Sequence, residues 1–394
     1  MRIKYLFINI LLGLLIIPFI SRAQFDSTVS ITGGLNALRV AVPFLTISPD
    51  SRAGAMGDVG AASSPDVNSQ HWNPAKFPFI EGKEWGVSLS YTPWLRNLVN
   101  DINLTNLTGY YKLDNMQVIS GSLLYFSMGE VTFTNSIGEQ VKMFNPNEFA
   151  LDFGYSRKFS DHIGGAMVFR YIRSDLTGGY STEGTAKAGT SFAADVAMYY
   201  QSPIQLNGKN GEMAFGLNIS NIGAKLSYND DPNKDFIPIN MRLGGRISMD
   251  IDNYNNVSFM LDANKLLVPT PPIYDQNNEI VKGMDPNVAV VQGMVQSFYD
   301  APGGLKEELQ EIYYSTGVEY WYAKQFALRA GYFYENKNKG NRKYLTLGAG
   351  LRYNVFNIDF AYLIPAAGFN SPMANTVRFS LSFDFDSATT KRKK

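Results

Sequence analysis

Apolar and polar residues alternate at every second position through most of the chain, and this period is typical of β-strands. Thr376–Phe385, with the sequence TVRFSLSFDF, shows the alternation most clearly. Successive side chains of a strand point to opposite sides, so this segment has one apolar face and one polar face. The same pattern predicts strands at Glu84–Thr92, Asn103–Lys112, Met116–Ser127, Glu148–Lys158, His162–Ser174, Thr190–Tyr200, Glu212–Ser220, Pro238–Met249, Asn256–Asn264, Glu311–Tyr322, Phe326–Glu335, Lys343–Tyr353, Phe356–Ile364 and Thr376–Phe385.

The polar faces of these segments carry charges of both signs. In a soluble sandwich each apolar face would meet a second sheet, but here nearly every strand repeats the same pattern. Strands that are apolar outside and polar inside are typical of an outer-membrane barrel. The segments are about ten residues long, which is enough for a tilted strand to cross a bilayer.

The connections alternate between short and long. The short ones are Leu113–Asn115, Phe159–Asp161, Ala323–Gln325 and Asn354–Val355, with Gln201–Gly211 as a longer exception. The long ones are Pro93–Ile102, Met128–Asn147, Asp175–Gly189, Asn221–Ile237, Lys265–Gln310 and Pro365–Asn375. Bacterial barrels have short periplasmic turns and longer outer loops. We therefore predict an all-β fold, a 14-stranded antiparallel transmembrane β-barrel over residues 84–386, with both chain termini in the periplasm.

Charged residues on the inner faces of these strands would point into the barrel lumen. An arginine that faced lipid instead would cost about 2–4 kcal/mol at mid-membrane. These charges could line a conduit or brace the wall and hold a plug. We favour bracing, because the signs are balanced. The residues are Arg170, Arg242, Arg246, Arg329, Arg352, Arg378, Asp152, Asp262, Glu319, Glu335, Asp359 and Asp384.

Residues 24–83 precede the first predicted strand and are rich in small and apolar residues. A short helix is expected to begin near Pro49, and the sequence HWNPAKF follows. We interpret this segment as an N-terminal plug, or hatch, in the periplasmic mouth, with Asn73, Pro74 and Ala75 as its motif. The alternative is a flexible periplasmic arm, but the apolar content argues against disorder.

The connection Lys265–Gln310, about 46 residues, is far longer than usual, and such loops are generally functional or disordered. Asp285 could cap a helix beginning at Pro286, a favoured first position. An apolar helical face on an outer loop must pack against the barrel rim or against another protein. We favour a partner-binding surface made of Val288, Val291, Met294, Val295, Phe298 and Tyr299.

Residues 1–23 have a positive start, an apolar run and small residues at the end, which is the pattern of a secretory signal peptide. An uncleaved anchor is the less favoured alternative, because the run is short for a span. The chain contains no cysteine, so neither a lipoprotein anchor nor disulfides are expected. A formal net charge of +0 argues against a nucleic-acid partner. Residues 387–394 are interpreted as a periplasmic tail.

We find no pattern of residues for catalysis, for a cofactor or for a metal, so the chain is not predicted to be an enzyme. Only two histidines, His71 and His162, are present, and without cysteine a zinc site is implausible. Neither histidine is expected near the outer rim, where a lipid hydrolase would need one. Asn229–Asp235 collects oxygen ligands but lacks the spacing of a calcium loop, so a solvated turn is favoured.

Two sets of residues resemble known families. Asn73, Pro74 and Ala75, followed by the fourteen strands, resemble the FadL-type outer-membrane barrels, which carry this triplet in their hatch. More distinctively, Ile31–Ala62, His71–Phe77 and Phe298–Leu309 resemble the PorV family, also called LptO. That family belongs to the type IX secretion system of Bacteroidetes, and the resemblance covers nearly the whole mature chain.

The resemblance implies a shuttle and docking protein. Such a protein would bind the giant translocon barrel of the SprA or Sov type and capture the C-terminal signal domains of cargo proteins. It would deliver them to the attachment complex with the PorU sortase, which links cargo to anionic lipopolysaccharide in the outer membrane. One alternative is a FadL-type transporter of hydrophobic small molecules, although the lumen charges argue against a continuous apolar pocket. A third alternative is a lipid A deacylase, but the sequence offers no residues for that reaction.

Overall fold

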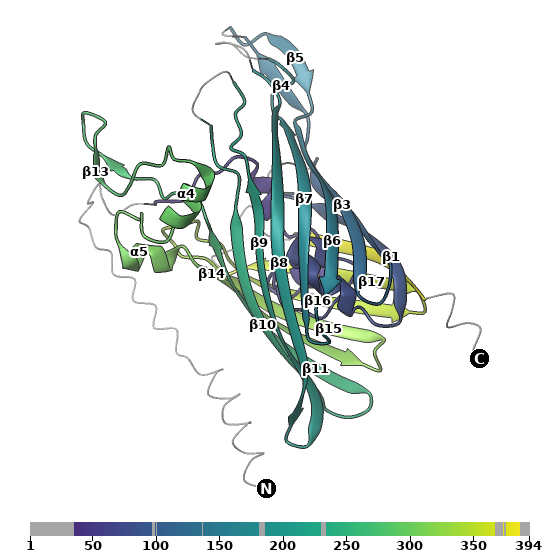
Figure 1. Ribbon diagram of the computed structural model, residues 1–394. Coiled ribbons are helices and arrows are strands. Elements are labelled where there is room, and N and C mark those ends of the chain that lie inside the picture. Colours follow the sequence, from purple (N-terminus) through teal and green to yellow (C-terminus); the bar gives the residue numbers. More distant parts are fainter. Residues whose placement is uncertain are drawn as a thin grey trace. The chain divides into compact units, whose positions relative to one another are not determined.

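Fourteen strands close into a single antiparallel barrel in the computed structural model (Figure 1), which confirms the predicted fold class. The structure describes residues 35–386 apart from 97–98, 100, 136, 181–185, 230–233, 367–372 and 374–375. The predicted signal peptide, residues 24–34 and the predicted tail lie outside the described residues. The barrel strands are β1 (Lys83–Pro93), β2 (Ile102–Lys112), β3 (Gln117–Met128), β6 (Asn147–Lys158), β7 (Ile163–Asp175), β8 (Gly189–Leu206), β9 (Lys209–Gly223), β10 (Asn240–Asp250), β11 (Asn255–Leu266), β14 (Tyr313–Tyr322), β15 (Phe326–Tyr334), β16 (Lys343–Tyr353), β17 (Phe356–Pro365) and β18 (Val377–Asp386).

Each strand pairs with its neighbours in the chain, and β1 pairs with β18 to close the barrel. At this seam Trp85 lies opposite Phe385, and the two rings stack with centroids 3.9 Å apart. The alternation of polar and apolar residues determines which face of the sheet lines the lumen. On β18, Arg378 and Ser380 are buried in the interior, whereas Phe379 and Leu381 are exposed on the outer wall. Among the described residues, no helix is long and apolar enough to cross a bilayer.

Short turns gather at one end of the barrel and long loops at the other (Figure 1). At the short-turn end, β8 and β9 are longer than predicted and form a hairpin around Asn207 and Gly208. Both residues have positive φ, 52° and 76°, as a tight two-residue hairpin turn requires. At the long-loop end two small hairpins, which the sequence did not predict, add β4 (Val131–Thr134) with β5 (Gln140–Phe144) and β12 (Ile273–Tyr274) with β13 (Ile280–Lys282).

The segment before β1 runs along the lumen from the long-loop end to the short-turn end. From the sequence it was predicted only in the mouth at the short-turn end. At the long-loop end, the Asn36 N–H donates to Asn338 O at 2.9 Å and the Ala41 N–H to Phe236 O at 2.8 Å. At the opposite end the segment leads into β1 beside Ile80, whose carbonyl accepts from Lys112. Its short helices are η1 (Pro43–Thr46), α2 (Ser51–Gly54), α3 (Ser69–Trp72) and η2 (Pro74–Phe79).

Charged side chains of the wall hold this plug segment in place. Asp58 pairs with Arg378 at 2.7 Å, and the Asp262 carboxylate accepts from the Gly60 and Ala61 N–H groups at 2.7 and 2.8 Å. Buried charges are retained only when they are paired and hydrogen-bonded. These contacts favour the interpretation that the lumen charges brace the wall and the plug, rather than the interpretation that they line a conduit.

The half of the lumen nearest the long loops is apolar and is filled by the protein's own side chains. Phe44 and Leu45 of η1 pack there against Ile237, Ile239 and other buried residues of the wall and loops. Beside this apolar layer lies a cavity of about 10 Å³, lined mostly by polar side chains. That volume is roughly enough for one water molecule. The described lumen is therefore packed rather than open at this level.

Candidate partner-binding surface on the long loop

The connection between β11 and β14 is the most structured loop of the protein (Figure 1). It carries β12 and β13, then α4 (Val290–Gln296) and α5 (Leu305–Gln310). Its first residues, Leu267 and Val268, are buried in the apolar layer of the lumen. The base of the loop is thus part of the barrel core, and the helices project from a fixed foundation.

Helix α4 begins at Val290, so the prediction that Asp285 caps a helix starting at Pro286 was wrong. Asp285 instead accepts from the Asn287 N–H at 2.8 Å in a local turn. Ala289 precedes the helix in an extended conformation and provides no side-chain cap. The Gln296 side-chain amide donates to the Asp285 backbone carbonyl at 2.9 Å, so the end of the helix is tied back to this turn.

The apolar face of α4 points outward. Val291 is 71 % exposed, Val295 57 % and Phe298, just after the helix, 49 %. The inward face carries the buried Gly293 and Gln296 together with the partly buried Val290 and Met294. Leaving several large apolar side chains in contact with solvent is unfavourable, so the patch is a candidate interaction site.

Of the six residues predicted for partner binding, the structure places four on the exposed surface and two elsewhere. Val291, Val295, Phe298 and Tyr299 are exposed. Val288 and Met294 are only partly buried and pack against the apolar layer of the lumen. The four exposed residues are named the α4 patch below.

Gly293 explains how α4 lies so close to the barrel. A Cβ atom at this position would lie 2.5 Å from Cζ of Phe236 and 3.2 Å from Cγ of Pro269. Only glycine therefore allows the helix backbone to approach these two side chains without displacing them.

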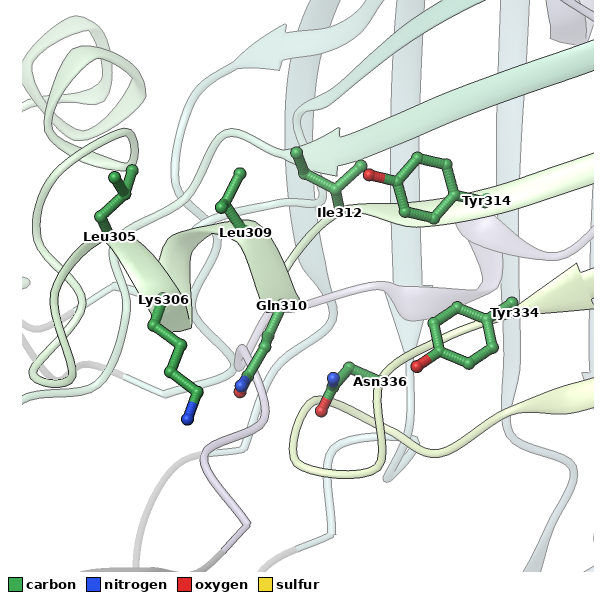
Figure 2. A pocket seen from close by; sticks show the side chains of 8 residues that line it. All are labelled: Leu305, Lys306, Leu309, Gln310, Ile312, Tyr314, Tyr334 and Asn336. Atoms are coloured by element: carbon green, nitrogen blue, oxygen red, sulfur yellow. The ribbon is translucent and has the colours of Figure 1, made fainter. Parts of the chain in front are cut away.

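Helix α5 adds a second exposed apolar region. Leu305 and Leu309, four residues apart, are 73 % and 57 % exposed. Figure 2 shows these leucines on one side of a groove and Tyr314 of β14 with Tyr334 of β15 on the other. The groove has a volume of about 490 Å³. The exposed leucines and the groove were not predicted from the sequence, although the spacing of four between Leu305 and Leu309 was the available signal.

Buried ion pairs fix α5 to the rim. Lys265 at the end of β11 binds Glu308 at 3.0 Å and Glu311 at 2.5 Å. Lys339, from the connection between β15 and β16, binds Glu307 at 2.6 Å and Glu311 at 2.9 Å. All these pairs are poorly accessible to water, so each carboxylate depends on its lysine partner. We name these five residues the rim cluster.

Asp300 lies beside the rim cluster and titrates unusually. Its Oδ2 accepts from the Thr270 N–H at 3.1 Å, while Oδ1 is buried without a partner among the described residues. Burial raises the pKa of Asp300 to about 6, and the nearby charges of Glu308 and Glu311 act in the same direction. Burial also acts to raise the pKa of Glu307, but hydrogen bonds, chiefly from Lys339, outweigh it and lower that pKa.

The predicted plug motif lies inside the barrel, away from the loop. The Asn73 side chain accepts from the Ala75 N–H at 3.1 Å and donates to Ala61 O and Met198 O at 2.9 and 3.0 Å. Pro74 O accepts from Ser156 at 2.8 Å. The motif thus ties the plug to β6 and β8, which is a structural arrangement.

The two histidines occupy unrelated places. His71 packs edge-on against Trp72 in the plug, and the Nδ1–H of His162 donates to Gln201 O at 2.8 Å near a short turn. In the part of the chain that the structure describes, no group of three or more His, Asp or Glu side chains is placed to hold a metal ion.

The closed barrel, the plug and the structured loop agree with the comparison to protein families. The family described as "Type IX secretion system protein PorV" matches residues 32–273. The chain belongs to the PorV family. A barrel of this family is an outer-membrane protein of type IX secretion. The family is one of secretion proteins and not of enzymes.

Solved structures that match this chain have low sequence identity to it. The Ralstonia pickettii toluene transporter TbuX is 11 % identical, with 86 % of this chain and 98 % of that chain covered and a TM-score of 0.43. The Pseudomonas putida toluene transporter TodX is 12 % identical, with 84 % and 95 % covered and a TM-score of 0.44. A Pseudomonas aeruginosa FadL homologue is 12 % identical, with 90 % and 99 % covered and a TM-score of 0.42. No curated protein sequence matches this PorV-family chain.

Proposed function

We propose that this PorV-family protein is a docking and shuttle component of type IX secretion. It binds the giant translocon barrel of the SprA or Sov type and captures the C-terminal signal domains of cargo proteins. It then delivers them to the PorU sortase attachment complex, which transfers cargo to lipopolysaccharide. The observation that supports this function best is the exposed apolar surface at α4. Val291, Val295, Phe298 and Tyr299 stay exposed, while the opposite side of the helix packs on the barrel through Val290, Gly293, Met294 and Gln296.

Burial of the α4 patch supplies the energy for docking. Covering a side chain such as Val or Phe contributes about 1.5–3 kcal/mol each. A few such residues packed close together are enough to dominate a protein interface. The α4 patch has this composition, with two valines and two aromatic side chains within nine residues, 291–299.

Rigidity of the loop also supports a docking role. The rim cluster and the close packing of Gly293 hold the helices in one arrangement before a partner arrives. A preformed surface loses less conformational entropy on binding than a flexible one. The barrel itself fixes the height and direction of the loop, which is how binding loops are commonly presented on a stable scaffold.

The test is a triple variant, V291S/V295S/F298S, expressed in the native cell. We expect a folded barrel, loss of the translocon from the co-purified complex, and cargo that is retained or released without attachment. The matched control, V131S/V141S/M143S, removes exposed apolar side chains from the β4–β5 hairpin and should secrete normally. Normal co-purification and cargo attachment in the α4 variant would contradict the proposal.

The alternative function, transport of hydrophobic small molecules as in FadL-type barrels, requires an apolar pocket above the plug. In the described residues that space is occupied by Phe44, Leu45 and their neighbours. The cavity of about 10 Å³ next to His71 and Arg242 is mostly polar and too small for a hydrocarbon. Docking is therefore the better supported of the two functions.

A further inference from the structure

A second groove lies at the long-loop end, between the plug's first described residues and two long loops. Its volume is about 340 Å³. Four prolines, Pro269, Pro271, Pro272 and Pro286, form much of its wall. The groove is further lined by Arg39, Lys225, Lys234, Asp235, Phe236 and Tyr274, and these six residues are named the basic groove.

The cations of the basic groove are not held in direct ion pairs. Within the described part of the chain, none of Arg39, Lys225 and Lys234 forms an ion pair. The lysines of the nearby rim cluster, in contrast, each bind two glutamates. Asp235 lines the groove and Asp285 lies close enough to act on Lys225, so three cations face two carboxylates and the groove carries an excess of positive charge.

Lys225 is the most constrained of the three cations. Its Nζ lies 4.3 Å from the centre of the Phe236 ring. Burial lowers the pKa of Lys225, because desolvation outweighs the attraction of Asp285 and Asp235. A partly desolvated ammonium without an ion-pair partner gains more from a bound anion than a fully hydrated one does.

The walls of the groove are fixed in place. Leu226 and Asp235 exchange two backbone hydrogen bonds of 2.8 and 2.9 Å, which close the loop that carries Lys225 and Lys234. The Phe236 carbonyl accepts from the Ala41 N–H at 2.8 Å, so the segment with Arg39 is attached to the same loop. Prolines restrict the backbone of the opposite wall. The groove is therefore preorganised, which reduces the entropy cost of binding.

We propose that the basic groove binds an acidic, extended polypeptide segment of a secreted partner, with carboxylates on Arg39, Lys225 and Lys234 and apolar side chains against Phe236 and Tyr274. The mixture of cations, aromatic rings and prolines suits a peptide that offers both charge and apolar surface. This inference rests on the proposed function for the presence of secreted chains at this end of the barrel.

A polypeptide fits the position of the groove better than a lipid does. Phe236 belongs to the apolar layer that fills the mouth of the lumen, and Pro269 follows the buried Val268 of the same layer. None of the lining residues belongs to a barrel strand, so the groove opens at the mouth of the barrel and not on the wall that faces acyl chains.

The test measures binding of a fluorescein-labelled decapeptide of alternating Glu and Val to the full-length protein in detergent. Fluorescence anisotropy should show binding that weakens with salt. A twin peptide with Gln in place of Glu should bind about 10-fold more weakly or worse. The variant R39Q/K225Q/K234Q should lose about 10-fold or more in affinity for the Glu peptide, because the three cations proposed to contact its carboxylates are removed.

The control variant K306Q/K324Q/K337Q removes the same number of positive charges from exposed sites outside the groove. It should bind the Glu peptide within about 2-fold of the unchanged protein, because surface charges far from a site act weakly. Equal losses in the two triple variants, or equal binding of the Glu and Gln peptides, would overturn the proposal.

Two further arms separate the remaining outcomes. Vesicles of phosphatidylcholine with phosphatidylglycerol test lipid binding, and loss of vesicle binding in R39Q/K225Q/K234Q with unchanged peptide binding would overturn the peptide assignment. The α4 variant V291S/V295S/F298S should bind the Glu peptide normally. If the α4 variant loses the translocon but keeps the peptide, the two surfaces act separately. If the groove variant keeps both the peptide and the translocon, this inference fails while the proposed function stands. If the α4 variant keeps the translocon, the proposed function fails instead.

Discussion

Arg52 of the plug and Glu319 of β14 form a buried two-point ion pair, with Arg52 Nε 3.0 Å from Glu319 Oε1 and Nη2 2.9 Å from Oε2. The same carboxylate accepts from Arg329 of β15 at 2.8 Å. Arg52 also binds Asp66 of the plug at 2.7 Å. The plug and the wall therefore share one charge network, and the stability of each depends on the other.

Substitution of Glu319 should loosen this network. Glu319→Gln leaves Arg52 and Arg329 close together without their shared carboxylate, which should cost about 3–5 kcal/mol of folding stability. The measurement is the temperature at which the barrel unfolds in detergent, followed by heat-modified migration on gels. The exposed control Glu130→Gln should unfold at the temperature of the unchanged protein. An unchanged midpoint for Glu319→Gln would show that the network does not hold the plug.

A side chain at position 293 should displace α4. Gly293→Val places a Cβ where it would lie 2.5 Å from Cζ of the buried Phe236, so helix or ring must move. We expect faster proteolysis of the long loop with an intact barrel. The control Gln292→Val adds an apolar side chain at the neighbouring, exposed position of the same helix and should leave the cleavage rate unchanged. Equal cleavage of the two variants would contradict the described packing.

Loss of Lys265 should release α5. Lys265→Met leaves Glu308 and Glu311 buried without this partner, and breaking a buried pair costs about 3–5 kcal/mol. Hydrogen exchange at Leu305–Gln310 should become faster, while the strands keep their protection. The exposed control Lys282→Met should exchange like the unchanged protein. Unaltered protection of α5 in Lys265→Met would argue against an anchoring role for the rim cluster.

The loop should become less stable as the pH rises through the pKa of Asp300. Burial raises this pKa from 3.8 to about 6. The contribution of protonated Asp300 to the stability of the loop is therefore fully present below pH 3.8 and is lost as the pH rises through about 6. Glu307, whose pKa is lowered, has the opposite dependence, and its contribution is lost as the pH falls below 4.5.

Hydrogen exchange of the loop as a function of pH, corrected for intrinsic rates, measures this dependence. Asp300→Asn mimics the protonated carboxyl group, so it should remove the loss of protection between about pH 4 and pH 6. If the pH dependence of protection is the same in Asp300→Asn and in the unchanged protein over this interval, Asp300 is not the titrating group.

The barrel could be predicted from the sequence because its cause is local. A period of two, set by the geometry of an extended chain, identified all fourteen barrel strands, and loop lengths gave their antiparallel order. Strand ends were less accurate where pairing continues past the apolar pattern, as in β8, which extends to Leu206.

The loop could not be predicted in the same detail because its structure depends on distant partners. Helical periodicity suggested that Val288, Val291 and Val295 share one face, but α4 starts after Val288 and is oriented by contacts of Gly293 with Phe236 and Pro269. The basic groove unites residues from three separate segments. Such long-range neighbours leave no periodic signal in a single sequence.

The central claim, that the α4 patch contacts the secretion machinery, is tested most directly by photo-crosslinking in cells. A photoreactive amino acid at Val295 is compared with one at Tyr353, which is 71 % exposed beside a short turn. The account predicts that position 295 crosslinks to the translocon or to a cargo signal domain and that position 353 does not. Absence of such products at position 295, with normal secretion by the labelled protein, would contradict it.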